Sequence, residues 1–196
     1  MAAEEPSLMR NRRHARALLL ASIAILALVS PAAAGDFRGD ASVSVARDET
    51  VDDDLYIGAG TISIAGTVNG DATVGGGTVT ITGTVNGSLN VGGGTVDVLG
   101  EVTGAVRVSG GTVRIAGTVG RDAVVFGGTV TVDPAGQIGG DLAGATGTLT
   151  MDGRIAGDLL AAAGTIRIAG TVDGAVDVSV GDLVVNAAAV VGGDVT

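Results

Sequence analysis

The sequence predicts an all-β fold, a single-stranded three-sided β-helix (β-solenoid) of about nine coils. Between Ala41 and Thr196 the chain repeats a pattern every 17 residues, most clearly in 60–76 (GTISIAGTVNGDATVGG) and 77–93 (GTVTITGTVNGSLNVGG). Aliphatic residues recur at fixed places in each copy, and 35 glycines punctuate them. A repeat this short buries its apolar side chains only by stacking on its neighbours.

Each repeat is numbered here from its leading glycine, so that Gly60 occupies position 1. The inward positions are expected to be 3, 5, 9, 13 and 15, because aliphatic residues alternate there with polar ones, as in strands. Glycines near positions 7, 11 and 16 to 1 are expected to supply the backbone angles of three corners. Parallel pairing of successive coils predicts a rod roughly 40 to 45 Å long.

Three repeats carry two extra residues at the same corner, namely 47–48, 134–135 and 187–188. A corner can bulge without shifting the inward residues, so these insertions are compatible with the solenoid.

The composition disfavours or excludes several kinds of partner and site. The net charge of −10 makes nucleic acid an unfavourable partner. Cysteine is absent, which excludes disulfides and thiolate sites. All basic side chains are Arg rather than Lys, and Asp far outnumbers Glu, a surface expected of a halophilic protein that stays hydrated at high salt.

Residues 1–34 are expected to be a secretory signal. Arg10, Arg12, Arg13 and Arg16 precede the apolar run 17–29, and an A-x-A motif ends at Ala34, where cleavage is expected. The competing interpretation is an uncleaved signal anchor. Both place the repeats outside the cytoplasm, secreted or held at the membrane. Residues 35–40 are then a short linker and 41–196 the repeat domain.

Aspartate recurs at position 12, directly after a corner. We expect these side chains to accept hydrogen bonds from corner amides. A cation site, for example for Ca²⁺, is the alternative, since carboxylates stacked along one edge resemble its oxygen ligands. The residues concerned are Asp54, Asp71, Asp122, Asp141 and Asp158.

No catalytic residues are expected. His14, the one histidine, lies in the N-terminal segment, so the repeats hold neither the His nor the Cys of common nucleophilic sites. We therefore expect no enzyme activity, cofactor or small-molecule substrate. Carbohydrate chemistry by paired aspartates remains a third, less favoured alternative.

The pattern Gly-Thr-Val-x-Ile-x-Gly-x-Val-x-Gly-Asp, seen in 60–71, 111–122 and 164–174, resembles the bactofilins, a family of polymer-forming cytoskeletal proteins. The resemblance implies a right-handed three-sided β-helix that assembles end to end, without nucleotide, into filaments that scaffold the cell envelope. Bactofilins are typically cytoplasmic, whereas this chain carries an export signal. The implied role is therefore an extracytoplasmic filament or spacer, with other copies of the chain and membrane or envelope components as partners.

The two ends of the predicted rod differ in polarity. The first coil is rich in charge, whereas the last holds mainly aliphatic residues and two aspartates. Exposed strand edges pair readily with other chains. We expect the C-terminal end to associate with a second copy and the N-terminal end to be repelled unless salt screens it; the candidate residues are Leu183, Val185, Val190, Val191 and Val195. The alternative function is an adhesin-like or cation-binding module.

Overall fold

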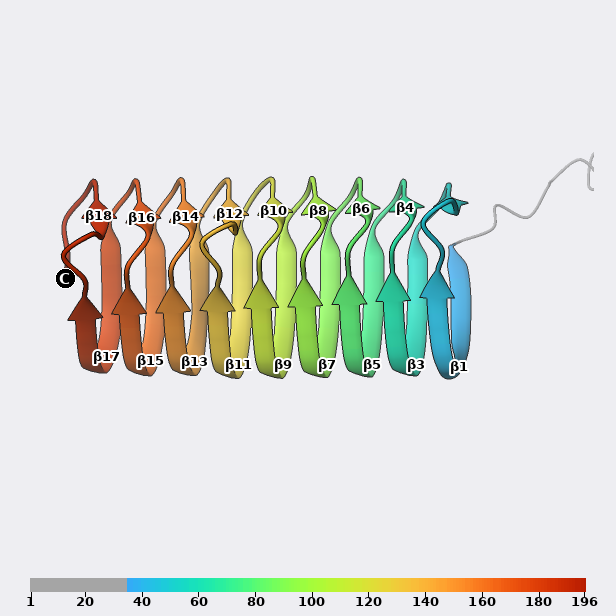
Figure 1. Ribbon diagram of the computed structural model, residues 1–196, viewed down its shortest axis with the longest axis horizontal. Coiled ribbons are helices and arrows are strands. Elements are labelled where there is room, and N and C mark those ends of the chain that lie inside the picture. The colour runs from blue at the N-terminus through green and yellow to red at the C-terminus, as the bar shows by residue number, and fades with distance from the viewer. Residues whose placement is uncertain (1–34) are drawn as a thin grey trace, which may run out of the picture. The chain divides into compact units, whose positions relative to one another are not determined.

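The structure, a computed structural model, describes residues 35–196. The predicted signal or anchor segment, 1–34, lies outside the described residues. The described part consists of strands and turns stacked as a row of parallel coils (Figure 1), which confirms the β-solenoid. Within it, no helix has the length and apolar character that crossing a membrane requires.

Each coil contributes one long and one short strand, and each kind forms its own parallel nine-stranded sheet. Equivalent residues face one another in successive coils, for example Ile62 and Val79. The long strands are β1 (Asp36–Val45), β3 (Leu55–Ile64), β5 (Ala72–Ile81), β7 (Leu89–Val98), β9 (Val106–Ile115), β11 (Ala123–Val132), β13 (Leu142–Met151), β15 (Leu159–Ile168) and β17 (Val176–Val185). The short strands are β2 (Thr50–Val51), β4 (Thr67–Val68), β6 (Thr84–Val85), β8 (Glu101–Val102), β10 (Thr118–Val119), β12 (Gln137–Ile138), β14 (Arg154–Ile155), β16 (Thr171–Val172) and β18 (Val190–Val191).

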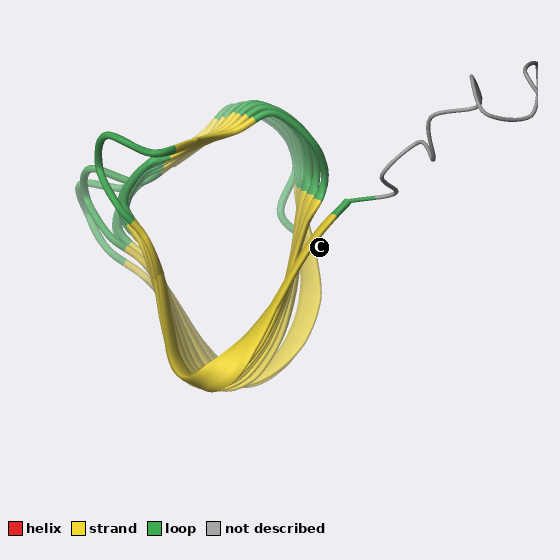
Figure 2. Ribbon diagram, turned by 90° about the vertical axis from the view of Figure 1, so that its right-hand side faces the viewer, coloured by secondary structure: helices red, strands yellow, loops and turns green. Residues whose placement is uncertain are grey.

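The coil is three-sided, but one corner is a bend within a strand rather than a break (Figure 2). The expectation of three separate strands is wrong at positions 16 to 1, where the long strand runs on around the corner. Pairing continues on both sides of the bend, from Gly58 with Gly75 to Thr61 with Thr78. Glycine lets a strand bend sharply because no side chain crowds the turn, so the pairing skips only the residue at the bend, here Gly60, and resumes directly after it.

The expected role of the corner glycines is also wrong. Gly35, before the first strand, is the one glycine with a positive φ among residues 35–196. The glycines at position 7 instead allow close stacking of coils. A Cβ at Gly83 would collide with the carbonyl oxygen of Gly66, and one at Gly117 with that of Gly100. Glycine is thus needed at this corner for space rather than for backbone angle.

The inward positions are confirmed. In the second coil, for example, Ile62, Ile64, Val68, Ala72 and Val74 are all buried. Each position forms an inward ladder, meaning a column of side chains from successive coils that lie over one another. No polar or charged residue within 35–196 is classed as buried, so the ladders share one dry core.

The first strand begins earlier than expected. Residues 36–40, predicted as a linker, belong to β1 and pair with residues 55–59 of β3. The first coil contains a two-residue insertion, so the equivalence across it is 19 residues rather than 17. This offset hides the start of the first coil from a search for the 17-residue period.

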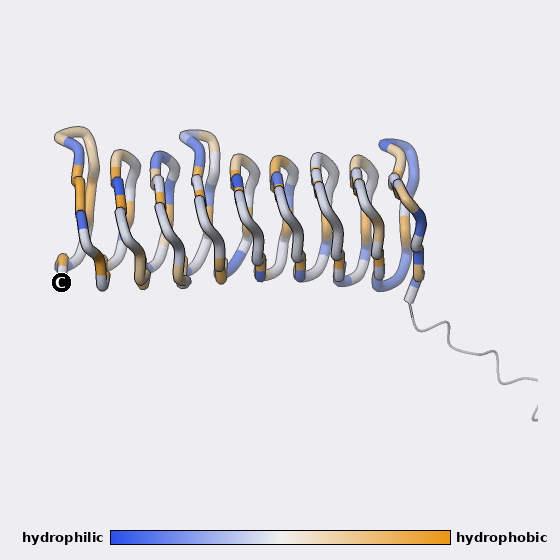
Figure 3. The backbone as a smooth tube through the Cα atoms, turned by 90° about the horizontal axis from the view of Figure 1, so that it is seen from below, coloured by the Kyte–Doolittle hydropathy of each residue, from blue (hydrophilic) through white to orange (hydrophobic). Residues whose placement is uncertain are grey.

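The three insertions lie at the same corner, as predicted, and make the coils project there (Figure 3). Each forms a turn closed by a backbone hydrogen bond. Glu49 donates to the carbonyl oxygen of Ala46 over 3.0 Å, and Gly136 to that of Asp133 over 2.8 Å. The turn at 187–188 is closed in the same way.

Candidate functional site

The C-terminal end of the solenoid exposes the end of its core. Strand β17 pairs with β15 and, through Val176, with Val195 near the chain end; β18 pairs with β16 alone. The equivalent ladder residues Ile168 and Val185 are 0% and 47% exposed, because no coil covers the second. We name this end the C-terminal face and define it by the ladder ends Leu183, Val185, Val191 and Val195.

The structure brings four of the five predicted association residues to the ends of the inward ladders. Leu183 continues the column of Ile166, and Val185 that of Ile168. Val191 continues the column of Val172, and Val195 that of Val176. The fifth, Val190, continues the column of Thr171 on the outer side of β18 and is 56% exposed. It borders the C-terminal face without ending a ladder.

The N-terminal end is closed by an ion-paired group. Asp36 and Arg38 occupy the slots of β1 that continue the ladders of Leu55 and Ile57. The Nη2 of Arg38 lies 2.6 Å from a carboxylate oxygen of Asp36 and 2.6 Å from one of Glu49. We name Asp36, Arg38 and Glu49 the N-terminal cap.

The cap joins two segments of the first coil. Arg38 belongs to β1 and Glu49 to the turn before β2, and their ion pair links the two. The long stem of an arginine covers apolar surface while its charged end stays near water. In the same coil, Val45 is 1% and Val51 5% exposed. The core is therefore covered at this end and open at the other.

Glu49 also satisfies a backbone amide at the strand edge. In the second coil the amide of Ala65 donates to the carbonyl oxygen of Val45 over 2.9 Å. The equivalent amide of the first coil, that of Ala46, donates instead to Oε2 of Glu49 over 3.1 Å. A carboxylate thus takes the place that a backbone carbonyl takes in the second coil.

The charges of the cap stabilise one another. The hydrogen bond from Arg38 lowers the pKa of Asp36 and that of Glu49 below their ordinary values, and the two carboxylates raise the pKa of Arg38. Sequence reasoning missed Asp36 and Arg38 because it placed them in a linker. Counting back from Val43 at position 3 assigns Asp36 and Arg38 to the inward positions 13 and 15, which is the signal that could have found them.

The aspartates at position 12 form hydrogen bonds between coils. Oδ1 of Asp54 accepts from the amide of Asp71, and Oδ1 of Asp141 from that of Asp158, each over 2.8 Å. Asp71, Asp122 and Asp158 accept in the same way from the next coil. Among the described residues, no group of three or more His, Cys, Asp or Glu side chains could hold a metal ion.

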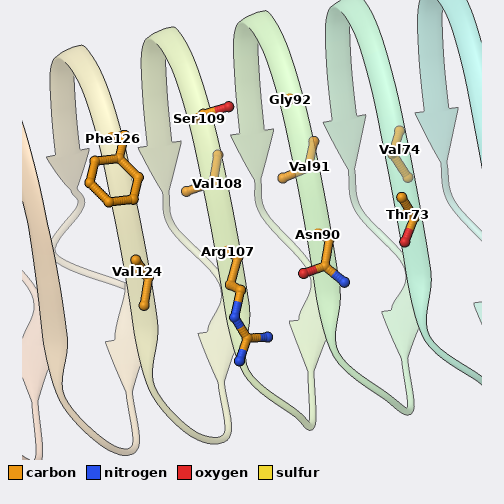
Figure 4. A pocket seen from close by; sticks show the side chains of 10 residues that line it. All are labelled: Thr73, Val74, Asn90, Val91, Gly92, Arg107, Val108, Ser109, Val124 and Phe126. Atoms are coloured by element: carbon orange, nitrogen blue, oxygen red, sulfur yellow. The ribbon is translucent and has the colours of Figure 1, made fainter.

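The outer face carries a shallow trough along strands β5, β7, β9 and β11 (Figure 4). Thr73, Asn90 and Arg107 line it from successive coils, and Phe126 borders it on β11. Its volume is about 340 Å³. A second hollow of about 500 Å³, bordered by Phe37 and Tyr56, shares Thr73 and Val74 with the first. The two hollows therefore adjoin on this face, and we call them together the outer trough.

All three aromatic residues of the chain border the outer trough. Phe37 and Tyr56 stack with ring centroids 4.7 Å apart and an angle of 10° between the planes. Phe126 lies four coils from Tyr56, a separation of about 19 Å at the spacing of parallel strands. No ion pair within residues 35–196 involves Arg107 (the described pairs use Arg38, Arg114 and Arg154), so its guanidinium is available to a ligand.

Comparison of the chain with protein-family models, with curated proteins and with solved structures finds no match.

Proposed function

We propose that this chain is a non-enzymatic structural protein that binds a second copy of itself through the C-terminal face and contributes to a scaffold at the outer side of the cell envelope. The observation that carries the proposal is the exposure of the ladder ends. Leu183, Val185 and Val195 are 37%, 47% and 50% exposed where their equivalents one coil earlier are buried completely. Exposed aliphatic side chains beside an unpaired strand edge favour association with a chain of the same kind.

The resemblance to bactofilins supports the same proposal. The repeat pattern in 60–71 is of their style, and the family assembles through the ends of a β-helix into polymers. Filaments of this kind require both ends of the solenoid to associate, so the resemblance supports association through an end and not the C-terminal end in particular. The predicted export signal supports a place outside the cytoplasm, with membrane or envelope components as neighbours.

The absence of His and Cys from residues 35–196 supports a role without nucleophilic catalysis or a cofactor. The net charge of −10 disfavours nucleic acid as a partner.

Replacing Val185 and Val191 by Asp tests the proposal. Both side chains end inward ladders, so the new carboxylates would meet one another across the joint of two C-terminal faces and repel. We expect the purified variant to be monomeric by light scattering where the unaltered chain is larger, and electron microscopy to show single short rods. An unchanged mass would contradict the proposal.

Val184→Asp is the matched control for the single change Val185→Asp, which should also weaken association. Val184 lies on the same strand and is 48% exposed, but its equivalent in the previous coil is the outward Arg167. The added charge is the same, and it lies outside the ends of the ladders. Association should weaken much less than in the Val185→Asp variant, because the new carboxylate keeps its contact with water.

The outer trough favours a second candidate function, the adhesin-like binding module. Aromatic rings with Asn and Arg between them suit a long glycan chain, which stacks its sugar rings on aromatic faces and accepts hydrogen bonds on its hydroxyls. Tyr56 and Phe126 would supply the stacking, and Asn90 and Arg107 the hydrogen bonds.

Affinity electrophoresis with neutral and uronic-acid polysaccharides tests this second candidate. We expect retardation of the chain that falls at least tenfold in the Phe126→Ala and Arg107→Ala variants. Leu160→Ala is the control, since Leu160 is an exposed apolar residue outside the lining of the trough. No retardation by any polysaccharide would rule out glycan binding by this face.

A further inference from the structure

The two ends of the solenoid are closed to different degrees, and we propose that the N-terminal cap limits assembly to a two-fold dimer joined through the C-terminal faces. This inference rests on the proposed self-association and adds its geometry: which ends meet, and where growth stops.

A head-to-tail joint would place the C-terminal face against the cap. If the columns continued across the joint, Val195 would lie over Asp36, and Leu183 and Val185 over Val43 and Val45 beside the cap, so the joint would exclude water from the charged groups. In a single molecule the side chains of Asp36 and Glu49 are 37% and 35% exposed. Removing the remaining water from three charged groups is unfavourable, and aliphatic neighbours offer no hydrogen bonds in return.

The inward ladders also stop at this end. In the second coil the slots at positions 13 and 15 hold Leu55 and Ile57, which are 0% and 5% exposed. In the first coil the same slots hold Asp36 and Arg38. An added coil would therefore find no aliphatic side chains on which to continue these two columns.

The strand edge at this end is partly occupied as well. Glu49 accepts the hydrogen bond of the Ala46 amide, which an added strand would otherwise take. Oδ1 of Asp40 accepts one from the amide of Ala41 over 2.6 Å. Charged residues at a strand edge are a known protection against further pairing.

Two C-terminal faces, by contrast, complement each other. Each offers the ends of aliphatic ladders, so apolar surface meets apolar surface. A joint between identical patches is isologous and closes after two copies. The acidic N-terminal ends, with seven Asp or Glu and two Arg between Asp36 and Asp54, then lie at opposite ends of a rod of about 85 Å, where their repulsion is screened.

Light scattering of the purified full chain at moderate salt gives the first test. We expect twice the mass of one chain over a wide range of protein concentration. A monomer would contradict the proposed self-association. Masses that rise without limit with concentration would contradict the proposed limit set by the N-terminal cap, but not the proposed self-association.

The double variant Asp36→Val/Arg38→Val gives the second test. It extends two aliphatic ladders to the N-terminal end and removes the ion pairs, so both ends become apolar. We expect dimers to join further, with masses of at least four chains and long rods in electron microscopy. Arg47→Val is the matched control, since it removes a charge from the same coil outside the cap, and it should remain a dimer.

The triple variant Asp36→Val/Arg38→Val/Val185→Asp shows whether the double variant assembles further because its cap is removed or only because the protein is destabilised. Its C-terminal face carries the new charge and its N-terminal end is open, so we expect dimers again, now joined through the N-terminal ends. A folded double variant that stays dimeric, or a folded triple variant that is monomeric, would overturn the proposal.

Discussion

At the scale of single residues, glycine determines how closely the coils stack. The glycines at position 7 have ordinary φ angles, but each lies against the backbone of the coil before it. Gly58 and Gly75, at position 16, have no atom within 4 Å of the place where a Cβ would stand. The sequence marks both classes with the same letter, and only the structure separates them.

Gly117→Ala and Gly75→Ala test this distinction. The new methyl group at 117 would collide with the carbonyl oxygen of Gly100, so the free energy of unfolding should fall by about 1–3 kcal/mol, as in overpacked cores. The methyl group at 75 meets nothing, and loss of chain entropy in the unfolded state should leave stability unchanged or raise it by up to about 1 kcal/mol. Urea denaturation of the two variants measures both values, and equal effects would contradict the steric explanation.

The aspartates at position 12 are explained as acceptors for amides of the next coil. Asp141→Ala removes the acceptor for Asp158 and should lower the free energy of unfolding by about 1 kcal/mol. Asp141→Asn keeps an oxygen acceptor and should lose less. Excess CaCl₂ should not change the melting temperature of the unaltered chain or of either variant. A rise with calcium in the unaltered chain that is absent from Asp141→Asn would show that the column binds cations instead.

At the scale of strands and coils, alternation of aliphatic and polar residues was enough to predict the inward ladders. Positions 3 and 5 are buried as expected, because a side chain on a pleated strand faces one side only. The continuous strand around one corner was not predictable, since a glycine pair signals a bend and a break equally. The start of β1 was missed because the first repeat was counted from Ala41, although Asp36 and Arg38 occupy positions 13 and 15 before it.

The N-terminal cap makes the first coil sensitive to acid. Asp36 and Glu49 have pKa values below their ordinary 3.8 and 4.5, so their contribution to stability is present above those values and is lost as the pH falls below them toward the folded-state pKa values. Hydrogen exchange should show the protection factor of the Ala46 amide falling between pH 6 and pH 3. The amide of Ala116, which donates to the carbonyl oxygen of Val98, is the internal control. A constant ratio of the two protection factors would contradict the role of the carboxylates.

At the scale of the whole molecule, the two ends of the solenoid differ: one carries an ion-paired group and the other exposes aliphatic side chains. The apolar end was predictable in part, because the last repeat is mainly aliphatic. The closed end was predictable only as a cluster of charges. The ion pair between Arg38 and Glu49, which closes it, is not evident from sequence order.

The asymmetry also governs the effect of salt on assembly. Seven acidic residues lie near the N-terminal end, and salt shortens the range of their repulsion. The apolar joint at the C-terminal face is not weakened by salt. The C-terminal joint is therefore expected to persist from dilute buffer to high salt, in keeping with the acidic, lysine-free surface.

Distances between spin labels test the account most directly, because the chain has no cysteine and single-cysteine variants are labelled at one place. Ser44 and Val184 occupy the same column at opposite ends and are both exposed. In a dimer joined through C-terminal faces, labels at Val184→Cys should lie within about 30 Å of each other and labels at Ser44→Cys about 80 Å apart, from the coil spacing. Equal distances of about 43 Å for both labels would show head-to-tail stacking and contradict the account.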